Sequence, residues 1–352
     1  MNFSFVQVLP GHKDDKTMKK ALKILWNLLL WTILCLCSVF HETTTYLFHQ
    51  SCGQISILLN TQTFDEYASE NELSKEQKIS LDLINEIKKY SVDSLGYKPT
   101  KNFTTIYNQK NASILWVITA SLKYKIEAFY WKFPVVGNVS YKGFFDKQKA
   151  IAAKNKLICE GYDVDLRSVS AWSTLGWFSD PVLSSMLSRS KGHLCNLIFH
   201  ELFHATYYAP SSVDFNENLA SFVAHKATQQ FLRMDTMELK SYLESYYDHK
   251  IIDNNISDKL NELNKFYDSI GNMPEHQKSI LRLQKLTKIS LSFQKLKLKD
   301  AKRIIPVQNN ILDFKNAMFV DFGQYNSLQD SLEGVFNKIY HSDLAKMVQS
   351  LK

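Results

Sequence analysis

The five residues His-Glu-Leu-Phe-His at positions 200–204 have the types and the spacing of a metal site that includes its own base. On a helix with about 3.6 residues per turn, His200 and His204 lie one turn apart on the same face. Two imidazoles in that arrangement can bind one zinc ion, and Glu201 lies beside them, where its carboxylate can accept a proton from a zinc-activated water. The competing interpretation is a surface helix with a chance match.

A zinc ion held by two histidines needs a third protein ligand and keeps a fourth position for water. Glu217 lies thirteen residues after His204. That separation lets one helix end, the chain turn at residues 209–212, and a second, antiparallel helix return Glu217 to the metal. An acid in a first helical turn can also be explained by the helix dipole. The position of Glu217 just downstream of a complete motif favours the ligand role.

Other histidines and acids nearby are poorly placed to bind the same ion. His193 lies about 10 Å along the helix from His200, and His225 lies about 12 Å along the second helix from Glu217. We expect surface or supporting roles for both. Asp214 precedes the second helix and is predicted to cap it.

Hydrolysis through a charged tetrahedral intermediate would also use one more hydrogen-bond donor. Tyr208, four residues after His204, is predicted to project from the same helix face and is the first candidate. Tyr141 and His225 are alternatives, and packing roles compete with all three assignments.

The elements that position these residues follow from hydrophobic spacing. Residues 193–209 lack Pro and Gly and predict a helix, which Pro210 ends. Upstream, helices are predicted over 73–90 and 146–160, and strands over 113–119, 124–133, 138–141 and in 163–178. Downstream, residues 235–298 have helical spacing, Pro306 breaks the run, and a last helix begins near Ser327. The predicted fold class is α+β and predominantly helical, a zincin-like metallopeptidase with a small sheet before the motif helix.

The N-terminal region predicts a membrane anchor. Residues 24–40 carry no charge, and about seventeen apolar residues are the minimum for a span. Five lysines precede this segment and none follows until Lys75, so the positive-inside rule places the N-terminus in the cytoplasm. The predicted organisation is a cytoplasmic basic leader (1–23), a transmembrane signal anchor (24–40) and an extracytoplasmic domain (41–352), periplasmic in a Gram-negative bacterium. That domain divides into 41–190 and 191–352. A cleaved signal peptide is the alternative, although no small-x-small cleavage site follows.

Composition excludes two other classes of protein. The formal charge of +7 comes partly from the leader, and no basic stripe with interleaved aromatics is present, so we expect no nucleic-acid partner. Cys35 and Cys37 lie in the apolar segment, which leaves Cys52, Cys159 and Cys195. Three cysteines do not make a disulfide framework.

With these residues in view, the chain resembles a bacterial family of predicted zinc aminopeptidases that carry a lipoprotein signal or a membrane anchor. The resemblance covers nearly the whole predicted extracytoplasmic part. It rests on residues 198–204 with Tyr208, 215–217 with Ala220 and Phe222, 171–178 with Asp180 and Pro181, 133–135 with Gly137, Tyr141, Gly143 and Phe145, and on 53–54 and 309–310.

The resemblance implies a membrane-anchored enzyme that hydrolyses peptide substrates, with zinc bound by His200, His204 and Glu217 and with Glu201 as the base. Two features depart from the family pattern. Cysteines are common in the family where this chain has Lys132 and Asn138, and the predicted anchor replaces the lipidated cysteine. A membrane-tethered zinc endopeptidase remains an alternative. A non-catalytic scaffold stabilised by zinc is another, and the presence of Glu201 argues against it.

Overall fold

The computed structural model describes residues 19–20, 22–27, 31, 41–133, 137–169, 179–210, 212–325 and 328–352. The chain forms two compact units, residues 1–53 and residues 54–352. Helix α2 (His41–Leu59) crosses that boundary. The second unit contains the predicted site and is mostly helical with small sheets, so the predicted α+β class is confirmed.

Short strands precede the motif helix in the second unit. One sheet has the order β1-β2-β8, in which β2 is antiparallel to β1 and parallel to β8. A second sheet has the order β6-β3-β7 and is antiparallel. Strands β4 and β5 pair in a separate two-stranded antiparallel sheet. Helix α5 packs on the β6-β3-β7 sheet. The bounds are β1 (Thr61–Gln62), β2 (Ile106–Tyr107), β3 (Trp116–Leu122), β4 (Trp131–Phe133), β5 (Gly137–Val139), β6 (Tyr141–Phe144), β7 (Tyr162–Ser168), β8 (Val182–Leu183) and α5 (Lys147–Cys159).

A first hydrophobic core surrounds the motif helix, α6. Its neighbours α4 and α7 pack directly against it, and the buried side chains of the three helices include Ile84 of α4, Ile198 and Phe199 of α6, and Val223 of α7. Because most of α6 is enclosed in this way, its position in the unit is fixed on several sides. The helices that contribute to this core are α3 (Phe64–Glu70), α4 (Lys75–Asp93), α6 (Lys191–Thr206), α7 (Val213–Phe231), α12 (Gln329–Ile339) and α13 (Leu344–Ser350).

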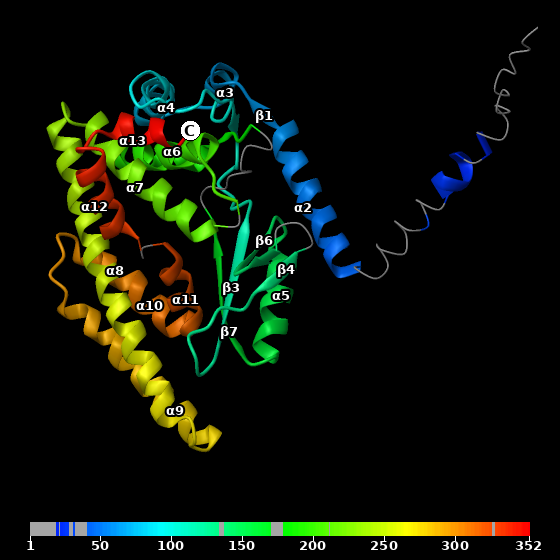
Figure 1. Cartoon of the computed structure of the whole chain (residues 1–352), viewed down its shortest axis with the longest axis vertical. Helices are drawn as coiled ribbons and strands as arrows, with labels where there is room; N and C mark the ends of the chain where they lie inside the picture. The colour runs from blue at the N-terminus through cyan, green and yellow to red at the C-terminus, as the bar shows by residue number, and fades with distance from the viewer. Residues whose placement is uncertain are drawn as a thin grey trace, which may run out of the picture. The chain divides into compact units, whose positions relative to one another are not determined.

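A second core lies among the helices that follow. It is formed by α8 (Thr236–Ile270), α9 (Glu275–Ser292), α10 (Ile304–Phe314) and α11 (Asn316–Tyr325). In Figure 1, α8 is the long yellow-green helix that passes from the region of α7 and α12 to the region of α9. It belongs to both cores, through Tyr242 in the first and Ile252 and Leu263 in the second.

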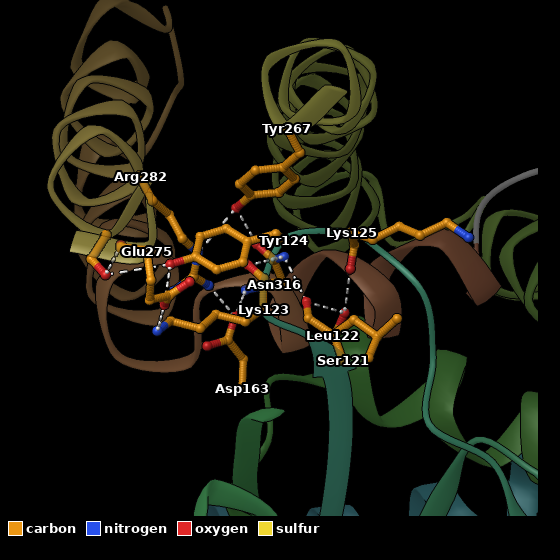
Figure 2. Close-up of polar contacts among 11 residues, drawn as sticks. Ser121, Leu122, Lys123, Tyr124, Lys125, Asp163, Tyr267, Glu275, Arg282 and Asn316 are labelled. Atoms are coloured by element: carbon orange, nitrogen blue, oxygen red, sulfur yellow. Dashed lines mark hydrogen bonds and ion pairs between the residues drawn. The ribbon is translucent and has the colours of Figure 1, made fainter. Parts of the chain in front are cut away.

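A buried polar cluster joins the β6-β3-β7 sheet to these helices (Figure 2). Arg282 of α9 forms an ion pair with Asp163 of β7, and both side chains are buried. Asn316, the first residue of α11, donates its backbone N–H to Asp163 and its side-chain amide to the carbonyl of Leu122, at 3.1 and 2.9 Å. Tyr267 of α8 donates its hydroxyl to Asn316 at 2.6 Å. The cluster therefore fixes α8, α9 and α11 against the sheet.

Two predictions of secondary structure are wrong. Only Trp131–Phe133 of the predicted strand 124–133 forms a strand, because Tyr124 packs instead against Tyr267 in the second core. Pro306 does not break a helix. It lies in the first turn of α10, where a backbone N–H has no helical partner and proline is tolerated. Residues 170–178 of the predicted segment 163–178 lie outside the described residues.

The predicted membrane-anchored, extracytoplasmic location is contradicted. In the described part of the chain, no helix combines the length and the apolar character needed to cross a membrane. Helix α2 is long enough but begins with His41, Glu42 and three threonines. Residues 28–30 and 32–40 of the predicted anchor lie outside the described residues.

Candidate functional site

Helix α6 carries the first part of the candidate site. Ser190 occupies its N-cap position, and the apolar side chains of Leu194, Ile198 and Leu202 are buried on successive turns. The helix ends at Thr206, because the next residue, Tyr207, adopts an extended conformation. This packing fixes the rotation of the helix.

The turn after α6 is held by one side chain. Asn216, which is 2% exposed, accepts a hydrogen bond from the backbone N–H of Ala209 and donates one to its carbonyl, both at 2.8 Å. This pair of bonds ties the first turns of α7 to the chain that leaves α6. Ser212, and not Asp214, occupies the N-cap position of α7, so the predicted capping role of Asp214 is wrong. Asp214 is exposed on the first turn.

The two helices bring together His200, His204 and Glu217. The two histidine Nε2 atoms are 3.1 Å apart. The carboxylate of Glu217 lies 3.2 Å from Nε2 of His200 through one oxygen and 3.4 Å from Nε2 of His204 through the other. Among the described residues, this is the one group of His, Cys, Asp or Glu side chains that could hold a metal ion.

Charges in the cluster are strongly coupled. Burial works to raise the pKa of Glu217, but hydrogen bonds with His200 and His204 outweigh it and lower that pKa to about 2. Burial raises the pKa of Glu201, and the carboxylates of Glu217 and Asp180 raise it further against the opposing charges of the histidines. The pKa of Glu217 is therefore lowered and that of Glu201 is raised, so the charged form of Glu217 is favoured.

Two neighbours of the cluster, Ser221 and Asp180, were given no role in the site by the sequence. Ser221, one turn after Glu217, places its hydroxyl 3.4 Å from Nδ1 of His200, and the four-residue spacing could have indicated it. Asp180 is 3% exposed, and its charge acts on Glu201. Its position depends on Asn102, whose side chain accepts a hydrogen bond from the N–H of Asp180, and no local spacing reveals such a contact.

The remaining candidates are not members of the cluster. Nε2 of His193 is 2.9 Å from the hydroxyl of Ser245, and His225 packs against Tyr242. Neither belongs to the metal-binding group. Because α6 ends at Thr206, Tyr208 does not continue its face and lies beyond the helix, 38% exposed. Tyr141 begins β6 and is 39% exposed.

Comparison with known proteins gives one match. The model of a family described as "Putative aminopeptidase" matches residues 45–352. The chain belongs to this family. Membership implies a peptidase, and the match extends over all of the sheets and helices that surround the cluster. Neither the search of the curated proteins nor that of the solved structures found a match.

Proposed function

We propose that this chain is a zinc-dependent aminopeptidase that binds one zinc ion through His200, His204 and Glu217. The observation that carries the proposal is the separation of the three ligand atoms. In a tetrahedral site with bonds of about 2.0–2.1 Å, ligand atoms stand about 3.3 Å apart. The separations here are 3.1, 3.2 and 3.4 Å. Two histidines and one glutamate also form a ligand set of catalytic zinc sites, which keep a fourth position open.

When bound, zinc supplies Lewis acidity that acidifies water and polarises a peptide carbonyl. Glu201 is outside the ligand group and next to His200, so its carboxylate is free to accept the proton of the attacking water and pass it to the leaving amine. The raised pKa of Glu201 brings this base closer to neutral pH, where proton transfer is most efficient. Tyr208 stays a predicted donor to the developing oxyanion.

The orientation of His200 also supports the proposal. A histidine that binds a metal through one ring nitrogen is oriented by a partner at the other. In His200 that partner is the Ser221 hydroxyl at Nδ1, and Nε2 faces the cluster. The order of elements, with short strands before α6 and helices after it, agrees with the predicted zincin-like arrangement.

The proposal is tested by measuring metal content and peptide cleavage on the same preparation. We expect about one zinc per chain, and mass spectrometry of a mixed peptide library should show shortening from the N-terminus. Matched N-acetylated peptides should resist. Internal cleavage would instead favour a zinc endopeptidase, and zinc without any cleavage would favour a non-catalytic scaffold. Absence of both zinc and cleavage would overturn the proposal.

A further inference from the structure

Helix α9 carries apolar side chains on two faces. One face is buried in the second core through Leu286 and Ile289. On the other face, Ile280, Leu283 and Leu291 are 46%, 59% and 53% exposed. Separations of three and eight residues place these three side chains on one side of a helix, over about 16 Å of its length. They therefore form an exposed apolar stripe, and grouped apolar side chains of this kind mark interaction surfaces.

An open hollow with a volume of about 600 Å³ lies along this stripe. Its lining runs from Leu283 to Lys295, and every lining residue belongs to α9 or to the 3-10 helix that continues it (Phe293–Lys295). A groove that receives an amphipathic helix encloses the apolar side of that helix. Because no second element supplies an opposite wall here, the hollow fits a flat apolar layer better than a partner helix.

The surface around the stripe is strongly basic. Residues 276–312 contain nine Lys or Arg and a single acid, Asp300. Three of the nine form ion pairs with acids of β7 and α8. Another five are lysines with exposed side chains and, among the described residues, no acid within ion-pair distance: Lys288, Lys295, Lys297, Lys299 and Lys302. This surface is therefore complementary to a negatively charged partner.

The distribution of these lysines favours a lipid surface over an acidic polypeptide. A helix face that combines lysines with exposed Leu and Ile is typical of proteins that lie on anionic membranes. Lys297, Lys299 and Lys302 follow the end of α9, beyond the apolar stripe. A partner helix confined to the stripe would leave them without a counter-charge, whereas the headgroups of a bilayer extend past the stripe in every direction.

We propose that the exposed face of α9 binds the surface of a membrane that contains anionic lipids. Ile280, Leu283 and Leu291 enter the boundary between headgroups and acyl chains, and the five lysines face the headgroups. The contact is peripheral. It involves one face of a folded helix, needs no spanning segment and does not depend on residues 24–40. It would hold the peptidase unit at a lipid surface, whichever peptides that unit cleaves.

The experiment measures how the full chain distributes between solution and sedimented lipid vesicles. Vesicles of phosphatidylcholine with about 30% phosphatidylserine should bind more protein than phosphatidylcholine alone, and about 1 M salt should weaken the binding relative to about 0.1 M. The lysines of residues 13–23 could also bind anionic vesicles. The decisive comparison is therefore between variants of the same full chain.

Two charge variants make the first comparison. Each lysine close to an anionic surface strengthens binding about fivefold, so Lys288→Gln with Lys295→Gln should weaken binding to the anionic vesicles about 25-fold. Lys75→Gln with Lys89→Gln, at two exposed lysines of α4, is the matched control and should bind as the unmodified protein does. Equal binding by the two double variants would overturn the inference.

Two apolar variants make the second comparison. Leu283→Gln should weaken vesicle binding about tenfold, the lower end for burying one leucine. Ile79→Gln in α4, where the side chain is 51% exposed, should have no effect. Both positions are on the surface, so both variants should fold. The inference fails if the chain forms a dimer that Leu283→Gln dissociates while vesicle binding stays unchanged, because the face then binds a second copy. It also fails if poly-glutamate binds in place of vesicles, because the partner is then an acidic polypeptide.

Discussion

The proposed function gives the two glutamates of the site different roles, and their pKa values are shifted in opposite directions. Glu217 is in the ligand group and Glu201 is not. Replacing Glu201 with Gln should therefore leave zinc bound, whereas an amide cannot accept the proton. We expect a loss of hydrolysis by a factor of about 10²–10⁴, the usual contribution of general base catalysis, with unchanged metal content. His204→Ala should lose both zinc and activity. Substantial turnover in Glu201→Gln would show that the base is another residue.

The buried His225 is expected to make the folded protein less stable in acid. Its ring nitrogens lie near Tyr242 and Gln229, and burial, helped by the charge of Lys226, lowers its pKa to about 4. Since the unfolded state has a pKa near 6.5, it binds the proton first as pH falls. The contribution of neutral His225 to the unfolding free energy is thus fully present above about pH 6.5 and is lost as the pH falls towards 4.

This linkage amounts to about 3 kcal/mol, at about 1.4 kcal/mol for each unit of pKa. In His225→Gln, the drop in unfolding free energy between pH 7 and pH 4 should be smaller by that amount, as measured by urea denaturation. The other titrating groups are common to both proteins and cancel in the comparison. An identical pH dependence in the variant would contradict a neutral, buried His225.

Residue spacing predicted the cluster because its contacts are nearly local. His200 and His204 are one turn apart, and a short connection returns Glu217. The placement of Tyr208 could not be predicted in the same way. The hydroxyl of Thr206 accepts a hydrogen bond from the backbone N–H of Lys98 at 3.1 Å, at the point where α6 ends. That contact joins residues far apart in sequence, so no helix-stop signal reveals it.

At the scale of elements, the close approach of α6 and α8 depends on Gly192. A Cβ at this position would lie 2.6 Å from Cβ of Tyr242, closer than real Cβ contacts. Gly192→Ala must therefore push the helices apart, and overpacking of this kind costs about 1–3 kcal/mol. Gly334→Ala in α12 is the matched control, since nothing lies within 4 Å of its added Cβ.

In an open helical position, the same substitution should stabilise the protein by up to about 1 kcal/mol. Urea denaturation of the two variants should therefore shift in opposite directions. Equal stability of the two variants would show that α8 can move without strain.

Elements with local end signals were predictable, and those defined by distant partners were not. Ser74 and Gln77 form a capping box at the start of α4, and Asp146 caps α5 by accepting two backbone N–H bonds. Both helices appear where the sequence predicts them. The two-residue strand β2 exists because residues 61–62 and 182–183 pair with it on its two sides. Such partners leave no signal in the strand itself.

At the scale of the whole second unit, the buried pair of Asp163 and Arg282 connects sheet and helices. Asp163→Ala would leave the guanidinium buried without its carboxylate, which costs about 3–5 kcal/mol. We expect that loss in unfolding free energy by urea denaturation. Lys125→Ala breaks the ion pair with Glu127, whose side chains are 68% and 51% exposed, and should cost less than about 1 kcal/mol. If Asp163→Ala lowered the unfolding free energy by as little as Lys125→Ala does, Arg282 would have to reach solvent or another partner in that variant.

The arrangement of the two cores could not be predicted from hydrophobic spacing alone. Residues 235–298 were predicted as helical, but nothing in that pattern tells which turns of α8 join which core. Tyr242 faces the first core and Leu263 the second. Which core a turn of α8 joins depends on the elements that pack against it. For the turns in the second core, these contacts include the polar cluster of Figure 2.

The short hairpin of α6 and α7 has a consequence for the order of folding. The contact between His200 and Glu217 joins residues that are 17 positions apart in the sequence, whereas Arg282 and Asp163 are 119 positions apart. Closing the longer loop costs about 2 kcal/mol more in chain entropy, at about 0.6 kcal/mol per doubling of length. The hairpin of α6 and α7 can therefore form before sheet and helices meet, and a folding nucleus there would let the proposed zinc ion act as an early template for the rest of the chain.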